Sequence, residues 1–194
     1  MTRLRALTLA LLCGAIALPA TAQQTPREPR ADAREFTLTS AALVDGAALP
    51  ADLRCTRSGG EGVSPPLSWD NAPNGTQAYA IVMKHYPKGT YPGVNAPSHY
   101  WLVWNIPADA TGVARGNPTS LGFEGSDKDR RATGYTPPCS PAGAGTHEYT
   151  IWVYALDTPL KDLPEQDDIG TGWTEVMAAL NGHVLAGDSL SFLN

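Results

Sequence analysis

The sequence predicts a mainly β fold, an antiparallel sandwich with one short helix near the C-terminus. Runs rich in β-branched and aromatic residues are separated by stretches that contain glycine, proline and asparagine, which is typical of strands joined by turns. Only residues 173–180 have the apolar spacing of a helix, with Thr174 as an N-cap and Gly182 as a C-terminal stop. A succession of strands with a single late helix favours two packed antiparallel sheets.

The strongest strand pattern runs from Tyr149 to Leu156. Alternation places Tyr149, Ile151 and Val153 on one face of this strand. Both faces are mostly apolar, so we expect an interior strand of a sheet that is covered on two sides. Other strands are predicted at residues 36–40, 79–85 and 100–105, with a short final strand at 190–193.

The N-terminus has the pattern of an export signal. Two arginines precede a short apolar run, and an Ala-Thr-Ala triplet follows it as a cleavage site. Residues 1–22 are therefore predicted to be a signal peptide, followed by a disordered leader at 23–34 and one domain at 35–194. The apolar run is shorter than the about 20 residues that a membrane span needs. We expect a periplasmic or secreted protein.

The charge balance argues against two classes of partner. The chain carries 14 Lys and Arg against 19 Asp and Glu, with a formal net charge of −5 and no basic run. Such a chain offers no basic patch to nucleic acid or to an anionic membrane surface. We expect no nucleic-acid partner and no membrane span.

Two cysteines remain outside the signal peptide, Cys55 and Cys139, and both fall in predicted loops. Exported proteins fold in oxidising compartments, and one pair allows only one intramolecular connection. A Cys55–Cys139 disulfide is therefore the favoured interpretation. Two separate free thiols remain the alternative, because the sequence does not show that the two Cα atoms come close together.

A loop rich in proline and glycine precedes the strongest strand. Its prolines fix φ and remove backbone donors, whereas its glycines allow positive φ, so the loop has an imposed shape. His147 and Tyr149 follow the loop as i, i+2 neighbours on one face, about 7 Å apart. His85 lies at a strand end next to another loop. These residues indicate a site mounted at the end of a scaffold.

Four segments in a fixed order carry a family pattern. They are GGEGVSPPLSW at 59–69, HYWLVWNIP at 99–107, GYTPPCSPAGAGTHEYTIWVYAL at 134–156 and ALNGHVLAGDSL at 179–190. Together they resemble the phosphatidylethanolamine-binding protein family, in its bacterial Raf-kinase-inhibitor-like branch. The resemblance implies a Greek-key β-sandwich with a small anion pocket at one end, where a phosphate-like group, acetate or a phospholipid headgroup binds. It implies no catalysis, no cofactor and no obligatory metal.

Part of the family's pocket is matched by residues of this sequence. His147 and Tyr149 match the family's His-x-Tyr pattern, and residues 134–141 match the loop that walls the pocket. The resemblance therefore implies that Gly134 and Pro138 of this loop lie at the ligand together with His147 and Tyr149.

The rest of the pocket departs from the family. Residues 84–88 read Lys-His-Tyr-Pro-Lys where Asp-Pro-Asp-x-Pro is usual, so His85 stands in place of the first aspartate. Tyr100 stands where a histidine is usual, and His99 is one residue away on the opposite face. An imidazole in place of a carboxylate removes a negative charge and adds a group that ionises near neutral pH. Anion binding can survive this exchange, whereas a headgroup amine loses its acidic partner.

We therefore expect a non-catalytic protein that binds a small anionic ligand, either a phosphate-like group or a phospholipid headgroup. The predicted ligand-binding residues are His85, Tyr100, Gly134, Pro138, His147 and Tyr149. The imidazoles and phenols of this set are the predicted hydrogen-bond donors.

Other interpretations stay open. The domain could be a protein-interaction module that inhibits a kinase or a protease through the long segment at 111–133. Cys139 and His147 could form the thiol–imidazole pair of an enzyme, although the loop matches no cysteine-hydrolase signature. His147 and Tyr149 could also be a structural pair at a strand start. The charges at 127–131 are interpreted as a solvated turn, and no short ligand spacing indicates a metal site.

Overall fold

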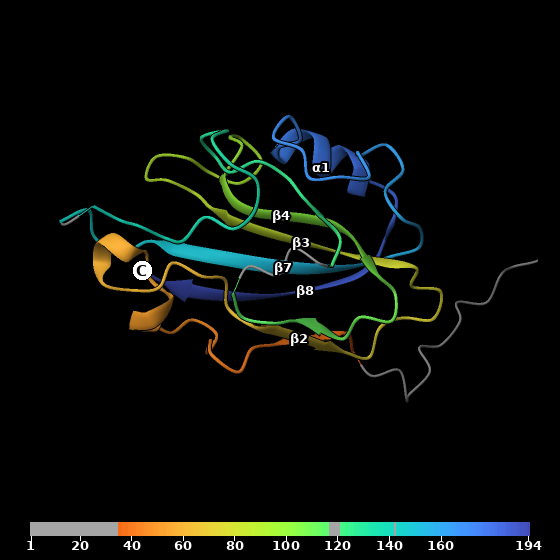
Figure 1. Cartoon of the computed structure of the whole chain (residues 1–194), viewed down its shortest axis with the longest axis horizontal. Coiled ribbons are helices and arrows are strands. Elements are labelled where there is room, and N and C mark those ends of the chain that lie inside the picture. Colours follow the sequence, from red (N-terminus) through yellow and green to blue (C-terminus); the bar gives the residue numbers. More distant parts are fainter. Residues whose placement is uncertain (1–34, 117–120, 142) are drawn as a thin grey trace, which may run out of the picture. The chain divides into compact units, whose positions relative to one another are not determined.

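Two antiparallel β-sheets and one α-helix form the part of the chain that the computed structural model describes, residues 35–116, 121–141 and 143–194 (Figure 1). The predicted signal peptide and the predicted leader lie outside these ranges. The strands are β1 Thr37–Thr39, β2 Leu67–Asp70, β3 Ala78–His85, β4 Ser98–Pro107, β5 Gly112–Val113, β6 Phe123–Glu124, β7 Glu148–Leu156 and β8 Val184–Leu193. The helices are the 3₁₀ turns η1 Ala51–Leu53 and η2 Thr56–Ser58 and the α-helix α1 Trp173–Leu180. The predicted fold class is confirmed.

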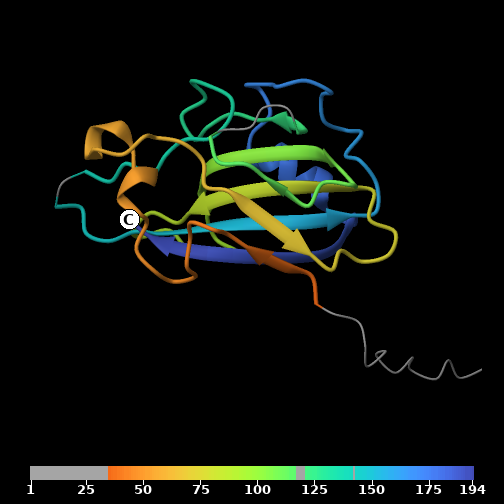
Figure 2. The same ribbon diagram turned by 60° about the horizontal axis from the view of Figure 1, so that its bottom comes forward.

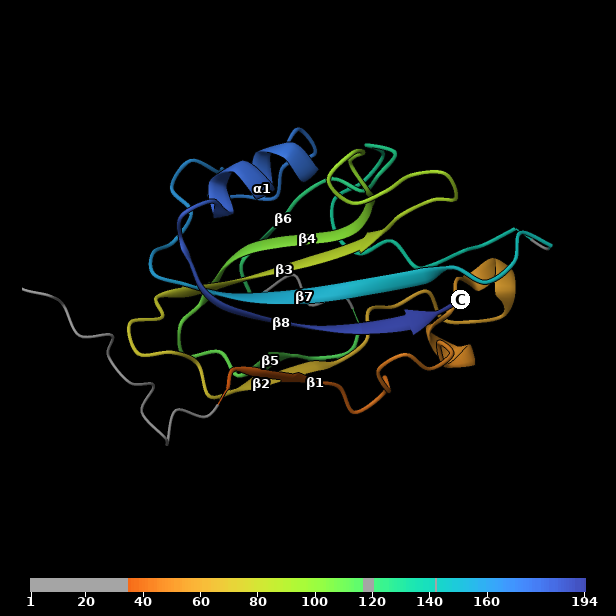
Figure 3. The same cartoon turned by 180° about the vertical axis from the view of Figure 1, so that it is seen from behind.

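The two sheets form the layers of the sandwich. The larger sheet has the strand order β6-β4-β3-β7-β8, and the smaller has the order β1-β2-β5. Figure 2 and Figure 3 show the smaller sheet against one face of the larger one, whereas α1 lies on the opposite face. The central strands of the larger sheet therefore lie between two covering layers.

Alternating apolar residues fill the space between the sheets. Ile81, Met83, Ile151 and Val153 are fully buried there, and they belong to the same cluster as Trp69 of the smaller sheet. Each such side chain contributes about 1.5–3 kcal/mol when it is removed from water. The alternation places Ile151 and Val153 on the same face of β7, and this is the face that packs against the smaller sheet.

The second apolar cluster lies beneath α1. Val176 and Leu180 are the buried residues of the helix, and they pack with Leu102 and Trp104 of β4. Because β4 contributes to both clusters, most of its side chains are buried.

The N-terminus of α1 differs from the prediction. Gly172 is the N-cap, and its N–H donates to Oε2 of Glu175 at 3.0 Å. A carboxylate in the first turn therefore accepts the N–H of the N-cap residue, and Thr174 lies inside the helix instead of capping it. With eight residues, α1 is far too short to cross a bilayer, and none of the helices in the described ranges is long enough.

The strand β8 is longer than predicted. It pairs with β7 along its whole length, from Val184 opposite Leu156 to Leu193 opposite Glu148. Residues 187–189 are Gly-Asp-Ser and carry no apolar alternation. The main-chain ladder with β7 forms the strand there without a sequence pattern.

The outer face of β7 is covered less completely than the sequence predicts. Trp152 and Tyr154 on this face stack at a ring distance of 5.6 Å but remain only half-buried. The Lys84 ammonium lies 5.7–5.9 Å from the rings of Tyr86, Trp152 and Trp173, and burial lowers the pKa of this lysine. These cation–π contacts link α1 to the sheet.

The segment 111–133 is part of both sheets. It contains β5, which pairs with β2, and β6, which pairs with β4. Asp127 closes a turn in which its Oδ1 accepts the N–H groups of Asp129 and Arg131, at 3.1 and 2.9 Å. The prediction of a solvated turn is right for residues 128–131 and wrong for Asp127, which is buried because it caps the turn. The segment is thus integrated into the fold.

A disulfide joins Cys55 to Cys139, as predicted, with their Cα atoms 5.3 Å apart. Two hydrogen bonds accompany it. The Cys55 N–H donates to the Pro138 carbonyl at 3.4 Å, and the Arg57 guanidinium donates to the Cys139 carbonyl at 2.9 Å. The bond fixes η1 and η2 against the proline-rich loop that precedes β7.

Removal of the disulfide through Cys55→Ala with Cys139→Ala is expected to lower the free energy of unfolding by about 2–4 kcal/mol. The reason is the separation of 84 residues between the cysteines, which leaves the unfolded chain much freer once the bond is absent. Urea titration followed by tryptophan fluorescence measures the change. A reductant should shift the wild-type midpoint and leave that of the variant unchanged, and an equal midpoint for both proteins without reductant would contradict the prediction.

Gly134, at the start of the same loop, lies against a buried carboxyl group. Its φ is 94°, and a Cβ built on it would lie 2.9 Å from Oε2 of Glu124. The other oxygen of Glu124 accepts a hydrogen bond from Nε1 of Trp101 at 2.8 Å. Burial raises the pKa of Glu124. Glycine is therefore required at this position both for the backbone conformation and for the close approach.

Gly134→Ala is expected to destabilise the domain by about 1–2 kcal/mol more than Gly143→Ala. Both glycines have positive φ, 94° and 79°, but nothing lies within 4 Å of a Cβ on Gly143. The difference between the two variants in a urea titration isolates the contact with Glu124 from the backbone strain, which the variants share. Equal losses would show that the contact is unimportant.

Candidate functional site

His85 and Tyr149 lie opposite one another at one end of the larger sheet. They form the last pair of the β3–β7 ladder, and His147 is the residue immediately before β7. The backbone of His147 exchanges two hydrogen bonds with that of Asn194, both at 2.9 Å. Figure 3 shows the end of β8 beside the start of β7 at this end of the sandwich. The C-terminal residue therefore holds the site histidine in place.

Four aromatic rings form the floor of the site. The ring of His85 stacks on Tyr149 at 4.8 Å and meets the ring of His147 edge-on at 5.0 Å. Tyr100 meets Tyr149 edge-on at 5.0 Å. Stacked and edge-on contacts at these distances are favourable arrangements of aromatic rings. The structure thus brings together four of the six predicted ligand-binding residues.

Tyr100 reaches this cluster because β4 contains an irregularity. Met83 pairs with Trp101, whereas the next residue, Lys84, pairs with His99, so Tyr100 is an extra residue in β4. Both Tyr100 and Trp101 belong to the cluster between the sheets, although they are neighbours in sequence. A β-bulge of this kind directs to one face two side chains that strict alternation would separate.

A cavity of about 370 Å³ lies over these rings. It is lined by His85, Pro87, Ser98, Tyr100, Lys128, Cys139, Ser140, Pro141, His147 and Tyr149. No aspartate or glutamate is among these lining residues. Four of the side chains carry an O–H, N–H or ammonium donor, those of Tyr100, Lys128, His147 and Tyr149, whereas the N–H of His85 faces the Glu148 carbonyl. The chemistry of the lining therefore favours an anion over a cation.

The two nitrogens of His85 have different roles. Nδ1 lies 2.8 Å from the carbonyl oxygen of Glu148, which can only accept, so Nδ1 carries the proton. Burial lowers the pKa of His85, the hydrogen bond to Glu148 opposes this shift, and the neighbouring His147 adds to it. At neutral pH the ring is therefore mainly uncharged.

The hydroxyl of Tyr100 remains protonated. Burial raises its pKa, and the neighbouring Tyr149 raises it further. Part of this effect is a hydrogen bond between the two phenols, so Tyr100 can donate at any physiological pH, either to Tyr149 or to a bound anion.

Lys128 is a lining residue that the sequence did not reveal as part of the site. It belongs to the charged turn at 127–131, and its ammonium pairs with Asp129 at 2.7 Å. Nothing in the local pattern distinguishes Lys128 from the other charges of this turn. Only the packing of the turn beside β4 places a cation at the cavity.

Gly134 and Pro138, which the resemblance implies at the ligand, are not among the residues that line the cavity. Gly134 is buried against Glu124, as described above. Pro138 is buried behind the disulfide, where its carbonyl accepts the N–H of Cys55. The loop turns away at these positions because its N–H at Thr136 donates to the Tyr100 carbonyl at 2.7 Å. The following residues, Cys139 to Pro141, form the wall instead.

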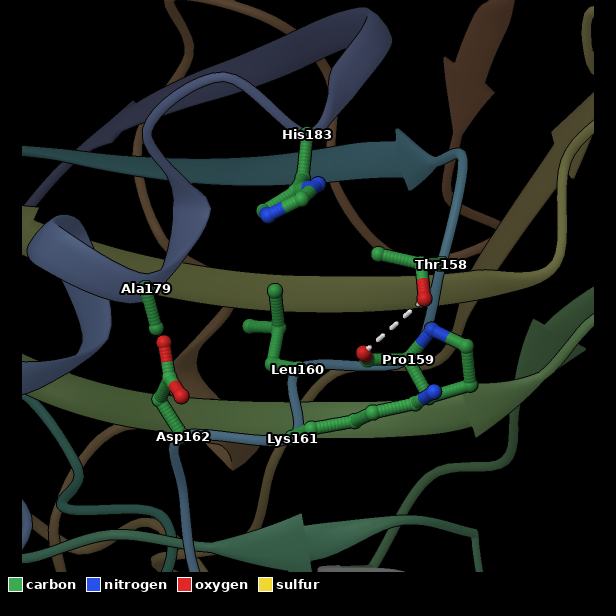
Figure 4. A pocket seen from close by; sticks show the side chains of 7 residues that line it. All are labelled: Thr158, Pro159, Leu160, Lys161, Asp162, Ala179 and His183. Carbon is green, nitrogen blue, oxygen red and sulfur yellow. Dashed lines mark hydrogen bonds between the residues drawn. The ribbon is translucent and has the colours of Figure 1, made fainter.

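A second cavity, of about 230 Å³, lies between α1 and the connection after β7 (Figure 4). His183 lines it and pairs with Asp157, the Nδ1–Oδ1 distance being 3.0 Å. The Lys161 ammonium and the Asp162 carboxylate lie on opposite sides of Leu160 in Figure 4. The charged groups of this second cavity therefore do not point toward a common ligand position. Within the described ranges, no group of three or more His, Cys, Asp or Glu side chains is arranged to hold a metal.

Comparison with known sequences identifies relatives in archaea and bacteria. The sequence profile of the family described as phosphatidylethanolamine-binding protein matches residues 39–193. A UPF0098 protein of Methanothermobacter thermautotrophicus is 34% identical over 157 residues, which cover 77% of this chain and 92% of that protein. The "Putative lipoprotein LppC" of Mycobacterium tuberculosis is 31% identical over 136 residues, 70% of this chain and 63% of LppC.

Solved structures with the same fold agree with this result. CT736 of Chlamydia trachomatis superposes with a TM-score of 0.68 at 26% identity, covering 82% of this chain and 97% of CT736. Escherichia coli YbcL superposes with a TM-score of 0.69 at 24% identity, covering 82% and 98%. With the family profile matched over nearly the whole described domain, the chain belongs to the phosphatidylethanolamine-binding protein family.

Proposed function

We propose that this chain is an exported, non-catalytic binding protein that holds a small anionic ligand in the cavity over His85 and His147. The observation that carries the proposal is the lining of that cavity, in which two imidazoles, two phenols and Lys128 surround about 370 Å³ without a carboxylate. Convergent donors in a concave site favour an oxyanion, because hydrogen bonds to a charged acceptor are the strong ones. A free phosphate-like ion and a phospholipid headgroup both offer this chemistry.

The state of the cavity cysteine supports binding without catalysis. Cys139 is bonded to Cys55, so its sulfur is not a thiolate that His147 could activate. Ser140, the neighbouring hydroxyl, is 3.3 Å from Nδ2 of Asn194, which donates to it. An amide donor does not activate a hydroxyl as a nucleophile, because it cannot take up the proton.

Export is supported by two independent features. A disulfide is typical of proteins that fold in an oxidising compartment. The name of the relative LppC contains the word lipoprotein, which is compatible with export. Both agree with the signal peptide that the sequence predicts at residues 1–22.

His147→Ala is expected to weaken the binding of inorganic phosphate at least tenfold in isothermal titration calorimetry at pH 7. The variant removes a donor that faces the cavity, and one hydrogen bond to a charged group is worth about 1.5–3 kcal/mol. His147 is only partly buried, so the domain should remain folded, which thermal unfolding would verify.

His183→Ala is the matched control, since it removes the same side chain from the second cavity. It should leave phosphate binding unchanged. Equal phosphate affinity in the wild type and in the folded His147→Ala variant would refute the assignment of the site, and an effect of His183→Ala alone would transfer it to the second cavity.

A further inference from the structure

The ring of His85 presents an acceptor, rather than a donor, to the cavity. Its Nδ1 proton is already used by the Glu148 carbonyl at 2.8 Å, so the neutral ring has a lone pair at Nε2. Among the described residues, no protein group donates to Nε2, and the ring lines the cavity. This nitrogen is therefore free to accept a hydrogen bond from a bound molecule.

We propose that His85 selects ligands in which a proton donor lies beside the oxyanion. The donor of the ligand would bind Nε2 of His85, while the oxyanion binds the donors supplied by Tyr100, His147 and Lys128. This inference rests on the proposed function, because it specifies which anions the same site accepts. His85 would then act as a specificity-determining residue.

Two kinds of ligand have the required donor. Inorganic phosphate keeps a P–OH group at every pH between 5 and 8, and an ethanolamine headgroup has an ammonium beside its phosphodiester. At pH 8 sulfate matches phosphate in shape and charge, and a choline headgroup matches an ethanolamine headgroup in charge, but neither sulfate nor the choline headgroup has an O–H or N–H. A ligand without such a donor would leave Nε2 of His85 as an acceptor without a hydrogen bond, which costs free energy. Sites built around a hydrogen bond from the ligand therefore discriminate strongly against analogues that cannot donate it.

The surroundings of His85 favour its neutral form, the form in which Nε2 can accept a hydrogen bond. The titratable groups that face it are His147 at 5.0 Å, Tyr149 at 4.8 Å, Tyr100 at 6.5 Å and Lys128 across the cavity. None of these is a carboxylate that would favour the charged imidazolium, and burial lowers the pKa of His85. The ring is thus neutral at pH 8. When the pH falls through the pKa of His85, Nε2 gains a proton and becomes a donor, so the selection should weaken.

Two matched pairs of probes test the inference by calorimetry at pH 8. The pairs are inorganic phosphate with sulfate, and glycerophosphoethanolamine with glycerophosphocholine. In each pair that binds, the member with the donor is expected to bind at least about tenfold more tightly. Whichever pair binds more tightly identifies the source of the ligand, a free phosphate or a lipid headgroup. Lowering the pH through the pKa of His85 should reduce the preference, because the ring then donates from both nitrogens.

His85→Phe keeps a ring on Tyr149 but removes Nε2, so the preference within each pair should approach unity. Tyr135→Phe is the control, because Tyr135 is buried and its hydroxyl has no partner, yet it does not line the cavity. It should retain the wild-type preference. Equal binding of both members of each pair by the wild type would overturn this inference and leave the proposed function intact. If neither inorganic phosphate nor glycerophosphoethanolamine binds, both this inference and the proposed function are overturned.

Discussion

The antiparallel register between β3 and β7 is the constraint on which the rest of the structure depends. The pairs follow one another without a shift from Ala78 opposite Leu156 to His85 opposite Tyr149. This ladder runs through the middle of the larger sheet, so it fixes both apolar clusters at once. Its last pair is also the first element of the site. A shift of one residue would turn the core residues to the wrong face and separate the two site rings, so the same interaction specifies the core and the cavity.

The cavity exists because several chain segments end or turn at the same edge of the sheet. The bulge in β4 adds Tyr100, the turn at 127–131 adds Lys128, and the loop before β7 adds the wall from Cys139 to Pro141. The disulfide and the main-chain bonds between His147 and Asn194 hold that loop from both sides. Binding sites need such support, because a side chain on an untethered loop does not keep its geometry.

The family resemblance implies an aspartate where this chain has His85, and that exchange would change more than the charge of the site. A carboxylate at the end of β3 would accept hydrogen bonds with a full negative charge, whereas the neutral imidazole accepts with one lone pair and repels an anion less. The hydrogen bond to Glu148 decides which nitrogen has this role. The proposed preference for anions and the proposed acceptor for a ligand proton are thus compatible in one site, because they reside on different side chains.

The sequence by itself determined the elements whose pattern is local. The sequence correctly predicted the alternation around Ile81 and Ile151, the helix at 173–180 and the cysteine pair. Burial of one face gives a strand or a helix a periodic apolar pattern, and a cysteine with a single possible partner allows only one pairing. The tertiary structure alone decided the length of β8, the inward position of both Tyr100 and Trp101, the contribution of Lys128, and the burial of Gly134 against Glu124. Each of these features depends on which segment, distant in the sequence, packs against the residue. Such long-range contacts produce no local sequence pattern from which they could be predicted.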